Sequence, residues 1–108
     1  MIFLLNNQPI GTIELFDFDV HHSRVGIGIM IDENAQNKGY ASVALDLLCD
    51  YCFQSLLVKQ IYCNISAGNE KSLHLFKKIG FKEIGLKKQW NKIAHNSFED
   101  EWLLQLIK

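Results

Sequence analysis

The sequence predicts an α+β domain in which two helices pack on a mixed sheet. Three observations lead to this. An apolar, β-branched run at residues 27–31 is followed by a tight loop and a long helical pattern. A second strand and helix follow in the same order at residues 57–79. Short strand patterns occupy both ends of the chain, so antiparallel hairpins flank a parallel strand–helix–strand unit. The expected order is β-β-β-α-β-α-β-β, in a single domain spanning residues 1–108.

The first three strands are expected before residue 32. Residues 2–5 form a short apolar run, and the cluster at residues 6–9 has the composition of a turn. Residues 10–18 alternate between apolar and polar types, as in a strand that is half buried. Residues 24–31 give the third strand. Its two glycines are poor strand formers, so they predict a bulge or a close approach to the backbone, where a ligand could lie.

The remaining elements alternate between helix and strand. Residues 41–56 carry apolar side chains at helical spacing, and residues 57–65 are expected to form the next strand. A second helix is predicted from Asn69 to Ile79, since two lysines precede Gly80 and favour a helix end. Two strands close the chain at residues 81–90 and 98–107, with residues 91–97 between them.

Composition narrows the function classes. The chain of 108 residues is 48% hydrophobic and 21% charged, with a net charge of −1, which is ordinary for a globular protein. It has no basic stripe, so nucleic acid is not an expected partner. No apolar run is long enough to span a membrane. Three cysteines, an odd number, favour a reduced, cytoplasmic chain.

The loop at residues 36–41 has the chemistry of an anion site. It precedes a helix, where free N–H groups and the helix dipole attract phosphates. Lys38 adds a positive charge, and Gly39 allows close approach of the main chain. The loop has a single glycine. This excludes the nucleotide P-loop, which needs two glycines, and the dinucleotide-binding fingerprint, which needs three.

Two motifs carry a resemblance to a known family. Gln36-x-x-Gly39-x-Ala41 resembles the pyrophosphate loop of the GNAT superfamily, the acyl-CoA-dependent N-acyltransferases. A second family motif is Asn-x-x-Ser/Ala, a Tyr four residues later, then x-Lys-x-Gly-Phe. It is matched here at Asn69, Ser72, Phe76, Lys78, Gly80 and Phe81. Residues 98–106 look like the last strand of the branch that acetylates ribosomal-protein N-termini and polyamines.

The resemblance implies where acetyl-CoA binds. In the family, the third strand and the strand after the first helix separate at their C-terminal ends, and acyl-CoA lies between them. The main chain of Ile29, Met30 and Ile31 would then bind the pantetheine arm. The diphosphate would bind amides in the loop and first turn, at Gln36, Asn37, Lys38, Gly39, Tyr40, Ala41 and Ser42. Asn69 would contact the cofactor, and Ser72, Phe76 and Lys78 would line the far wall.

The implied activity is acetyl transfer from acetyl-CoA to a primary amine by direct attack on the thioester. The acceptor would be a small amine such as a polyamine, or a protein N-terminal amine, and no metal is expected. The alternative is an acyl-CoA-binding module with weak or no catalysis, acting as a sensor or an assembly partner.

Three departures from the family motivate this alternative. Phe76 stands where many relatives have a tyrosine acid, and Gly26 stands where many have a glutamate. The usual N-terminal strand and two helices are missing, so a minimal enzyme or a wall supplied by a partner chain is expected, with homodimerisation favoured. The candidates for a base are Glu14, Asp17, His22 and Glu33, and the sequence does not choose among them.

Simpler interpretations apply to several of these residues. Asn69 can cap its helix as well as contact a cofactor. Cys49 and Cys52 lie one helical turn apart and are interpreted as buried cysteines rather than a metal or redox pair. His21 and His22 are interpreted as solvated, because no spaced partner ligands accompany them. Residues 99–101 are interpreted as a solvated, acidic strand end, with attraction of a cationic acceptor as the alternative.

Overall fold

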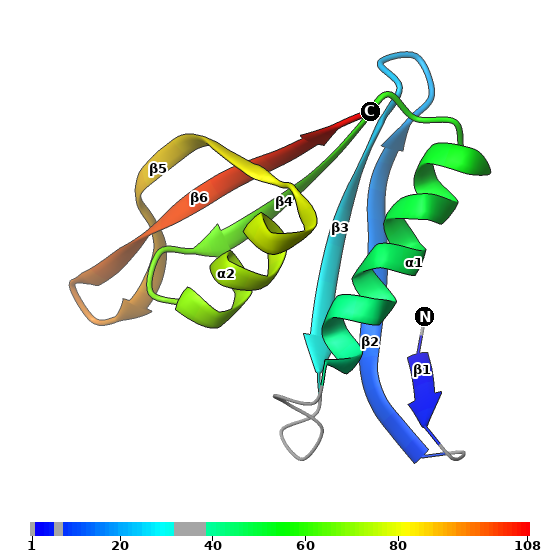
Figure 1. The fold of residues 1–108 in the computed structure, drawn as a ribbon. Coiled ribbons are helices and arrows are strands. Elements are labelled where there is room, and N and C mark those ends of the chain that lie inside the picture. The colour runs from blue at the N-terminus through cyan, green and yellow to red at the C-terminus, as the bar shows by residue number, and fades with distance from the viewer. Residues whose placement is uncertain (1, 6–7, 32–38) are drawn as a thin grey trace.

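The protein folds as a six-stranded mixed sheet with two helices (Figure 1). The computed structural model describes residues 2–5, 8–31 and 39–108. The elements are β1 Ile2–Leu5, β2 Gln8–Asp19, β3 Arg24–Ile31, α1 Tyr40–Gln54, β4 Gln60–Ser66, α2 Glu70–Ile79, β5 Lys82–Ala94 and β6 Ser97–Ile107. In the sheet the order is β1-β2-β3-β4-β6-β5. Only β3 and β4 are parallel neighbours, and every other pair is antiparallel. The predicted order of strands and helices is confirmed.

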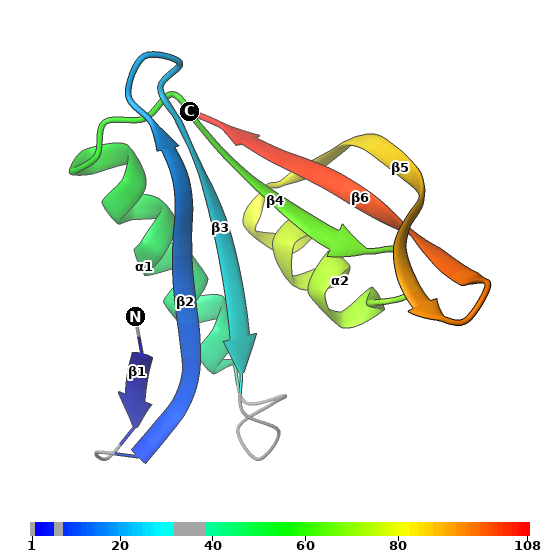
Figure 2. The same ribbon diagram turned by 180° about the vertical axis from the view of Figure 1, so that it is seen from behind.

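Both helices lie on one face of the sheet, and no helix of the described residues covers the other face (Figures 1 and 2). The core forms between this helical layer and the sheet. Leu45 of α1 and Ile61 of β4 are fully buried there, as is Leu104 of β6. Burial of each such side chain contributes about 1.5–3 kcal/mol. Successive residues of a strand point to opposite faces, so residues beside these core positions face the uncovered side.

Local capping explains why α2 begins and ends where it does. The side chain of Asn69 accepts a hydrogen bond from the backbone N–H of Ser72 at 3.2 Å, and Glu70 lies in the first turn. At the other end Gly80 has a φ of 121°, which favours glycine, and Lys77 and Lys78 lie in the last turn. The capping role predicted for Asn69 is therefore present.

Several predicted boundaries are wrong by a few residues. The turn expected at residues 6–9 overlaps β2, which already begins at Gln8; residues 6 and 7 lie outside the described residues. Helix α1 ends at Gln54 instead of residue 56. Strand β4 begins at Gln60 instead of residue 57, because Leu57 has a left-handed φ of 59°. The chain there is held by a hydrogen bond from the Lys59 N–H to Ser23 Oγ at 2.8 Å.

The last hairpin is longer than predicted. Residues 91–97 were expected to connect its strands, but β5 continues to Ala94 and β6 begins at Ser97. The register shifts between Lys87 and Asn91, and Gln89 has a φ of 48° there. Such an irregularity breaks the alternation of residue types that the sequence analysis relied on.

Candidate active site

The sheet opens between β3 and β4. The two strands pair only at Arg24, Val25 and Gly26 of β3, which lie opposite residues 60–62 of β4. Beyond this point β3 follows β2, and β4 follows β6, so the C-terminal halves diverge (Figure 2). The sequence analysis expected these strands to separate at their C-terminal ends, and they do. Backbone groups along these two inner edges can therefore pair with an extended ligand.

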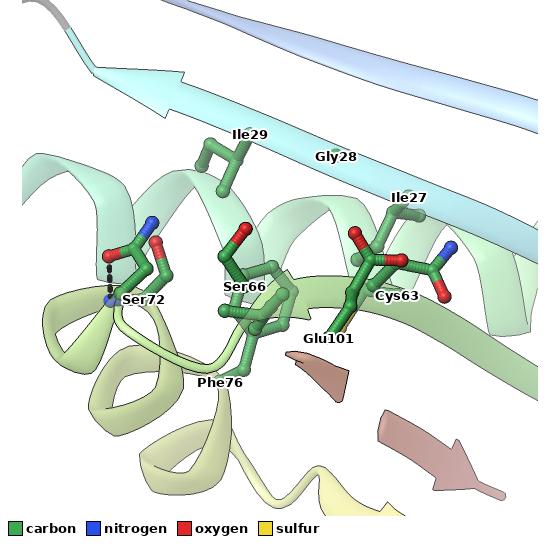
Figure 3. Close-up of a pocket in the computed structure, with 11 residues that line it drawn as sticks. Ile27, Gly28, Ile29, Cys63, Ser66, Ser72, Phe76 and Glu101 are labelled. Atoms are coloured by element: carbon green, nitrogen blue, oxygen red, sulfur yellow. Dashed lines mark hydrogen bonds between the residues drawn. The ribbon is translucent and has the colours of Figure 1, made fainter. Parts of the chain in front are cut away.

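A cavity of about 210 Å³ lies in this opening. Both strands, α2 and β6 contribute to its walls (Figure 3). Its lining consists of Ile27, Gly28, Ile29, Cys63, Asn64, Ile65, Ser66, Asn69, Ser72, Phe76 and Glu101. Pockets for compact, drug-sized ligands are usually about 300–1,000 Å³, so this one suits a narrow chain better than a bulky ring system. Asn64 and Glu101 are polar residues of its walls on the strands, and Asn69 and Ser72 are polar residues of its wall on α2.

Phe76 forms the apolar part of the wall on α2. It is buried, and its ring meets Phe81 edge to face at a centroid distance of 5.0 Å. A phenylalanine cannot donate a proton, so the wall at this position is inert. Asn69 and Ser72 line the cavity near the start of the same helix.

Gly26 contacts an aromatic side chain next to an irregularity in the sheet. Strand β3 runs in regular register opposite β2 as far as Gly26, which lies opposite Phe16, and the register shifts between Phe16 and Asp19. A Cβ atom at Gly26 would overlap the Phe16 ring and lie 2.7 Å from its Cδ2 atom. The sequence analysis offered a bulge or a close approach, and both occur beside Gly26, because the register shift follows Phe16 and the Phe16 ring lies against the backbone of Gly26. The Phe16 ring occupies the space that a side chain at position 26 would need.

Tyr62 completes this aromatic contact where the opening begins. Its ring meets Phe16 edge to face at 5.8 Å. Burial and the charge of Asp17 raise the pKa of its phenol, with a smaller opposing effect from Arg24. The phenol therefore stays protonated at neutral pH.

Among the described residues that line the cavity, Glu101 is the one carboxylate. It points across the opening toward β3 (Figure 3). Its Oε1 atom accepts from Lys87 Nζ at 2.7 Å and its Oε2 atom from Asn91 Nδ2 at 2.7 Å. Burial raises the pKa of Glu101, but the two hydrogen bonds outweigh it, so the pKa lies below its usual value. The side chain is only 15% exposed, and the interpretation of this residue as part of a solvated strand end is wrong.

The start of α1 differs from the start of α2. Gly39 is the N-cap residue with a left-handed φ of 79°, and within the described residues no side chain caps this helix end. No acidic residue lies in the first turn. The amides of Tyr40, Ala41 and Ser42 thus belong to a first turn without a side-chain acceptor, as an anion site requires.

The other predicted site residues fall into four groups. Ile29, Asn69, Ser72 and Phe76 line the cavity. Met30 is 72% exposed and Lys78 is exposed in the last turn of α2, and neither lines it. The backbone of Ile31 ends β3. Glu33, Gln36, Asn37 and Lys38 lie outside the described residues.

The candidate bases are spread over the sheet. Glu14 lies on β2 opposite Gly28, and its Oε2 atom is 3.9 Å from where a Cβ of Gly28 would be. Asp17, also on β2, is exposed. His22 lies in the β2–β3 loop, at the end where β3 and β4 still pair, and bonds Asp19 at 2.8 Å. Among the candidate bases that the structure describes, Glu14 is therefore the one that lies beside the opening.

The cysteines are buried and free. Burial raises the pKa of Cys49 to about 12, of Cys52 to about 11 and of Cys63 to about 12. Cys63 lines the cavity but remains a protonated thiol. In the described part of the chain, no three His, Cys, Asp or Glu side chains gather as a metal site. Across residues 2–5, 8–31 and 39–108, no helix has the length and apolar character needed to cross a bilayer.

Comparisons with known proteins point to one family. A family model described as an acetyltransferase (GNAT) domain matches residues 1–82. A spermidine N(1)-acetyltransferase of Escherichia coli (strain K12) is 32% identical over 80 residues, covering 74% of this chain and 43% of the relative. A putative ribosomal N-acetyltransferase of Bacillus subtilis (strain 168) is 32% identical over 82 residues, which is 76% of this chain and 45% of the relative.

A solved structure shares the fold. The spermidine N-acetyltransferase from Vibrio cholerae in complex with CoA and spermine superposes with a TM-score of 0.85 at 26% identity. The match covers 93% of this chain and 59% of that one. The chain thus spans less than half the length of the curated relatives cited and about three fifths of the solved one.

Proposed function

The chain belongs to the acetyltransferase (GNAT) domain family, and from that premise we propose that it transfers an acetyl group from acetyl-CoA to a primary amine. The observation that carries the proposal is the separation of β3 and β4 after Gly26, with a narrow cavity in the opening. An extended pantetheine arm can lie there and pair with the main chain of residues 29–31, as an added strand would.

The diphosphate of CoA is assigned to the start of α1. The first turn at Gly39, Tyr40, Ala41 and Ser42 supports this, because no side chain among the described residues caps it. We assign Gln36, Asn37 and Lys38 to the same site by family motif alone. Asn69, Ser72 and Phe76 would line the pantetheine arm from α2. Lys78 does not line the cavity, so we propose only that its side chain contacts the cofactor from the C-terminal end of α2.

The reaction follows from these positions. The lone pair of a neutral amine attacks the thioester carbonyl, forming the C–N bond. The C–S bond then breaks, and CoA leaves as a thiolate that takes up a proton. The nitrogen loses a proton to a base or to water. Glu14 is the candidate for this base among the described residues, and Glu33 is the other candidate. Phe76 has no proton to give to the leaving thiolate. A thiol is already a good leaving group, so the missing acid slows the reaction without preventing it.

The acceptor is proposed as a small amine such as a polyamine, or a protein N-terminal amine. Relatives named for spermidine and for ribosomal protein acetylation support both. The second candidate function is an acyl-CoA-binding module without efficient catalysis, which Phe76 and Gly26 favour. A reduced, cytoplasmic location agrees with three free, buried cysteines.

Release of free thiol from acetyl-CoA separates the two functions. With a panel of polyamines and an N-terminal peptide of a ribosomal protein, the enzyme should release thiol at a rate that depends on the amine. The same assay without amine gives the background hydrolysis. Binding of acetyl-CoA without amine-dependent release would leave only the binding module.

Self-association is proposed through α1. Val43, Leu47 and Tyr51 recur at intervals of four residues, so they form one stripe along the helix. They are 60%, 65% and 47% exposed. An apolar stripe of this kind is typical of a surface that another element covers. Light scattering should therefore give the mass of a homodimer for the purified chain, and a monomeric mass at high protein concentration would contradict this.

A further inference from the structure

The ammonium group of Lys87 occupies a three-sided site on the uncovered face of the sheet. Its Nζ atom donates to Glu101 Oε1 at 2.7 Å and to Asn64 Oδ1 at 2.8 Å. It also lies 4.8 Å from the centroid of the Trp90 ring. A carboxylate, an amide oxygen and an aromatic face are the partners that an alkylammonium ion prefers. The site is therefore suited to an alkylammonium ion, and in this structure it binds the side-chain ammonium group of Lys87.

Two of these three partners belong to the proposed acetyl-CoA cavity. Glu101 and Asn64 line it, whereas Lys87 reaches them from β5, at the edge of the sheet. Lys87 extends across β6 to do so, because β6 separates β5 from the strand that carries Asn64. A ligand inside the cavity therefore lies beside the same two side chains.

The carboxylate remains in position without Lys87. Its second oxygen is held by Asn91, and the side chain is only 15% exposed. A carboxylate that is largely buried needs a cationic partner, since an unpaired one is costly. Removing Lys87 therefore leaves an oriented negative charge beside the cavity, which another cation can satisfy.

We propose that Glu101 and Asn64 bind the charged amine of the acceptor as it enters, and that Lys87 fills this site until the acceptor displaces it. The bound ammonium then gives its proton to a base or to water, and its freed lone pair attacks the thioester. The inference rests on the proposed function, because the acceptor is the cation that must enter the cavity. Alkylamines have pKa values near that of lysine, about 10.4, so they arrive as ammonium ions at neutral pH. The simpler explanation is that the Lys87–Glu101 pair only ties β5 to β6.

Two substitutions separate these explanations, because they act in opposite directions on amine binding. Glu101→Gln removes the negative charge, and Lys87→Met removes the competing ammonium while keeping the length of the side chain. Glu99→Gln is the matched control, since Glu99 lies two residues along the same strand but does not line the cavity. The probe is n-butylamine, whose carbon chain matches that of lysine.

The KM for n-butylamine should rise about tenfold or more in Glu101→Gln, since a charge-assisted hydrogen bond is lost. It should fall severalfold in Lys87→Met and stay unchanged in Glu99→Gln. The affinity for acetyl-CoA should be the same in the wild type, Lys87→Met and Glu99→Gln. It is measured separately for Glu101→Gln, because Glu101 lines the cavity, and the KM for the amine is compared at saturating acetyl-CoA. Calorimetric titration of n-butylammonium into each CoA complex should give the same ranking of affinities, whether or not the protein turns over.

A purely structural ion pair would behave differently. Both Glu101→Gln and Lys87→Met would then lower the melting temperature while leaving the affinity for n-butylammonium unchanged, or shifted in the same direction. That result would overturn the inference, as would absence of n-butylammonium binding to the wild-type complex. Failure of acetyl-CoA to bind the wild type is a separate outcome. It would refute the proposed function, and titration of n-butylammonium into the free protein would then decide whether the ammonium site exists.

Discussion

Replacing Gly26 by glutamate is expected to lower the free energy of unfolding by about 1–3 kcal/mol. Any Cβ atom at this position overlaps the Phe16 ring. The ring has no free space to move into on the side of β4, because Tyr62 packs against it there. The substitution introduces the glutamate that the family resemblance led us to expect at this position, yet it should destabilise the fold. Urea unfolding followed by circular dichroism measures the loss.

The double substitution Phe16→Ala with Gly26→Glu is the informative control. Removing the ring makes room for the new side chain, so the double variant should be more stable than Gly26→Glu alone. The two effects should thus be strongly non-additive, as expected for residues in contact. Equal stability of Gly26→Glu and the wild type would contradict the overlap. Additive losses would show that the Phe16 ring is not the obstacle.

The parts of the fold that could be predicted are those with strong local patterns. Strand β3 matches its predicted bounds, since a run of β-branched residues enters a polar link. Helix α2 ends as predicted because Gly80 and two lysines are local signals. The opening between β3 and β4 was predicted from the family resemblance. Nothing in residues 24–31 or 60–66 alone determines where two parallel strands separate.

The contacts that the sequence could not assign to single residues depend on register between strands. Glu101 belongs to a run of three acidic residues, and only its pairing with Lys87 separates it from its neighbours. That pairing follows from a hairpin with register shifts, which the residue pattern does not reveal. The contact between Phe16 and Gly26 is likewise a matter of cross-strand register. A glycine opposite an aromatic residue on a neighbouring strand is the signal that could have been sought.

Replacing Ser66 by tryptophan is expected to weaken acetyl-CoA binding by about 100-fold or more, which is a loss of about 2.7 kcal/mol. Ser66 is the last residue of β4, and its side chain points into the opening (Figure 3). An indole ring there would occupy the cavity that we assign to the pantetheine arm. Ser66 is half-buried at the end of its strand and is not one of the buried core residues, so the fold should tolerate the ring.

Thr12→Trp is the matched control for this variant. Thr12 is exposed on β2, opposite Met30 in register, and does not line the cavity. The control adds the same ring to the uncovered face, so it should bind acetyl-CoA as the wild type does. If both variants lost affinity equally, a general effect of the added ring would explain the loss, and the cavity would not be the binding site.

Calorimetric titration of acetyl-CoA into the wild type and Ser66→Trp tests the central claim, that the opening between β3 and β4 holds the cofactor. The wild type should bind with an affinity of about micromolar order, and the Ser66→Trp variant should give little heat until acetyl-CoA is about 100-fold more concentrated. No binding by the wild type at millimolar acetyl-CoA would contradict the account. So would an unchanged affinity in Ser66→Trp, because the cofactor would then bind elsewhere.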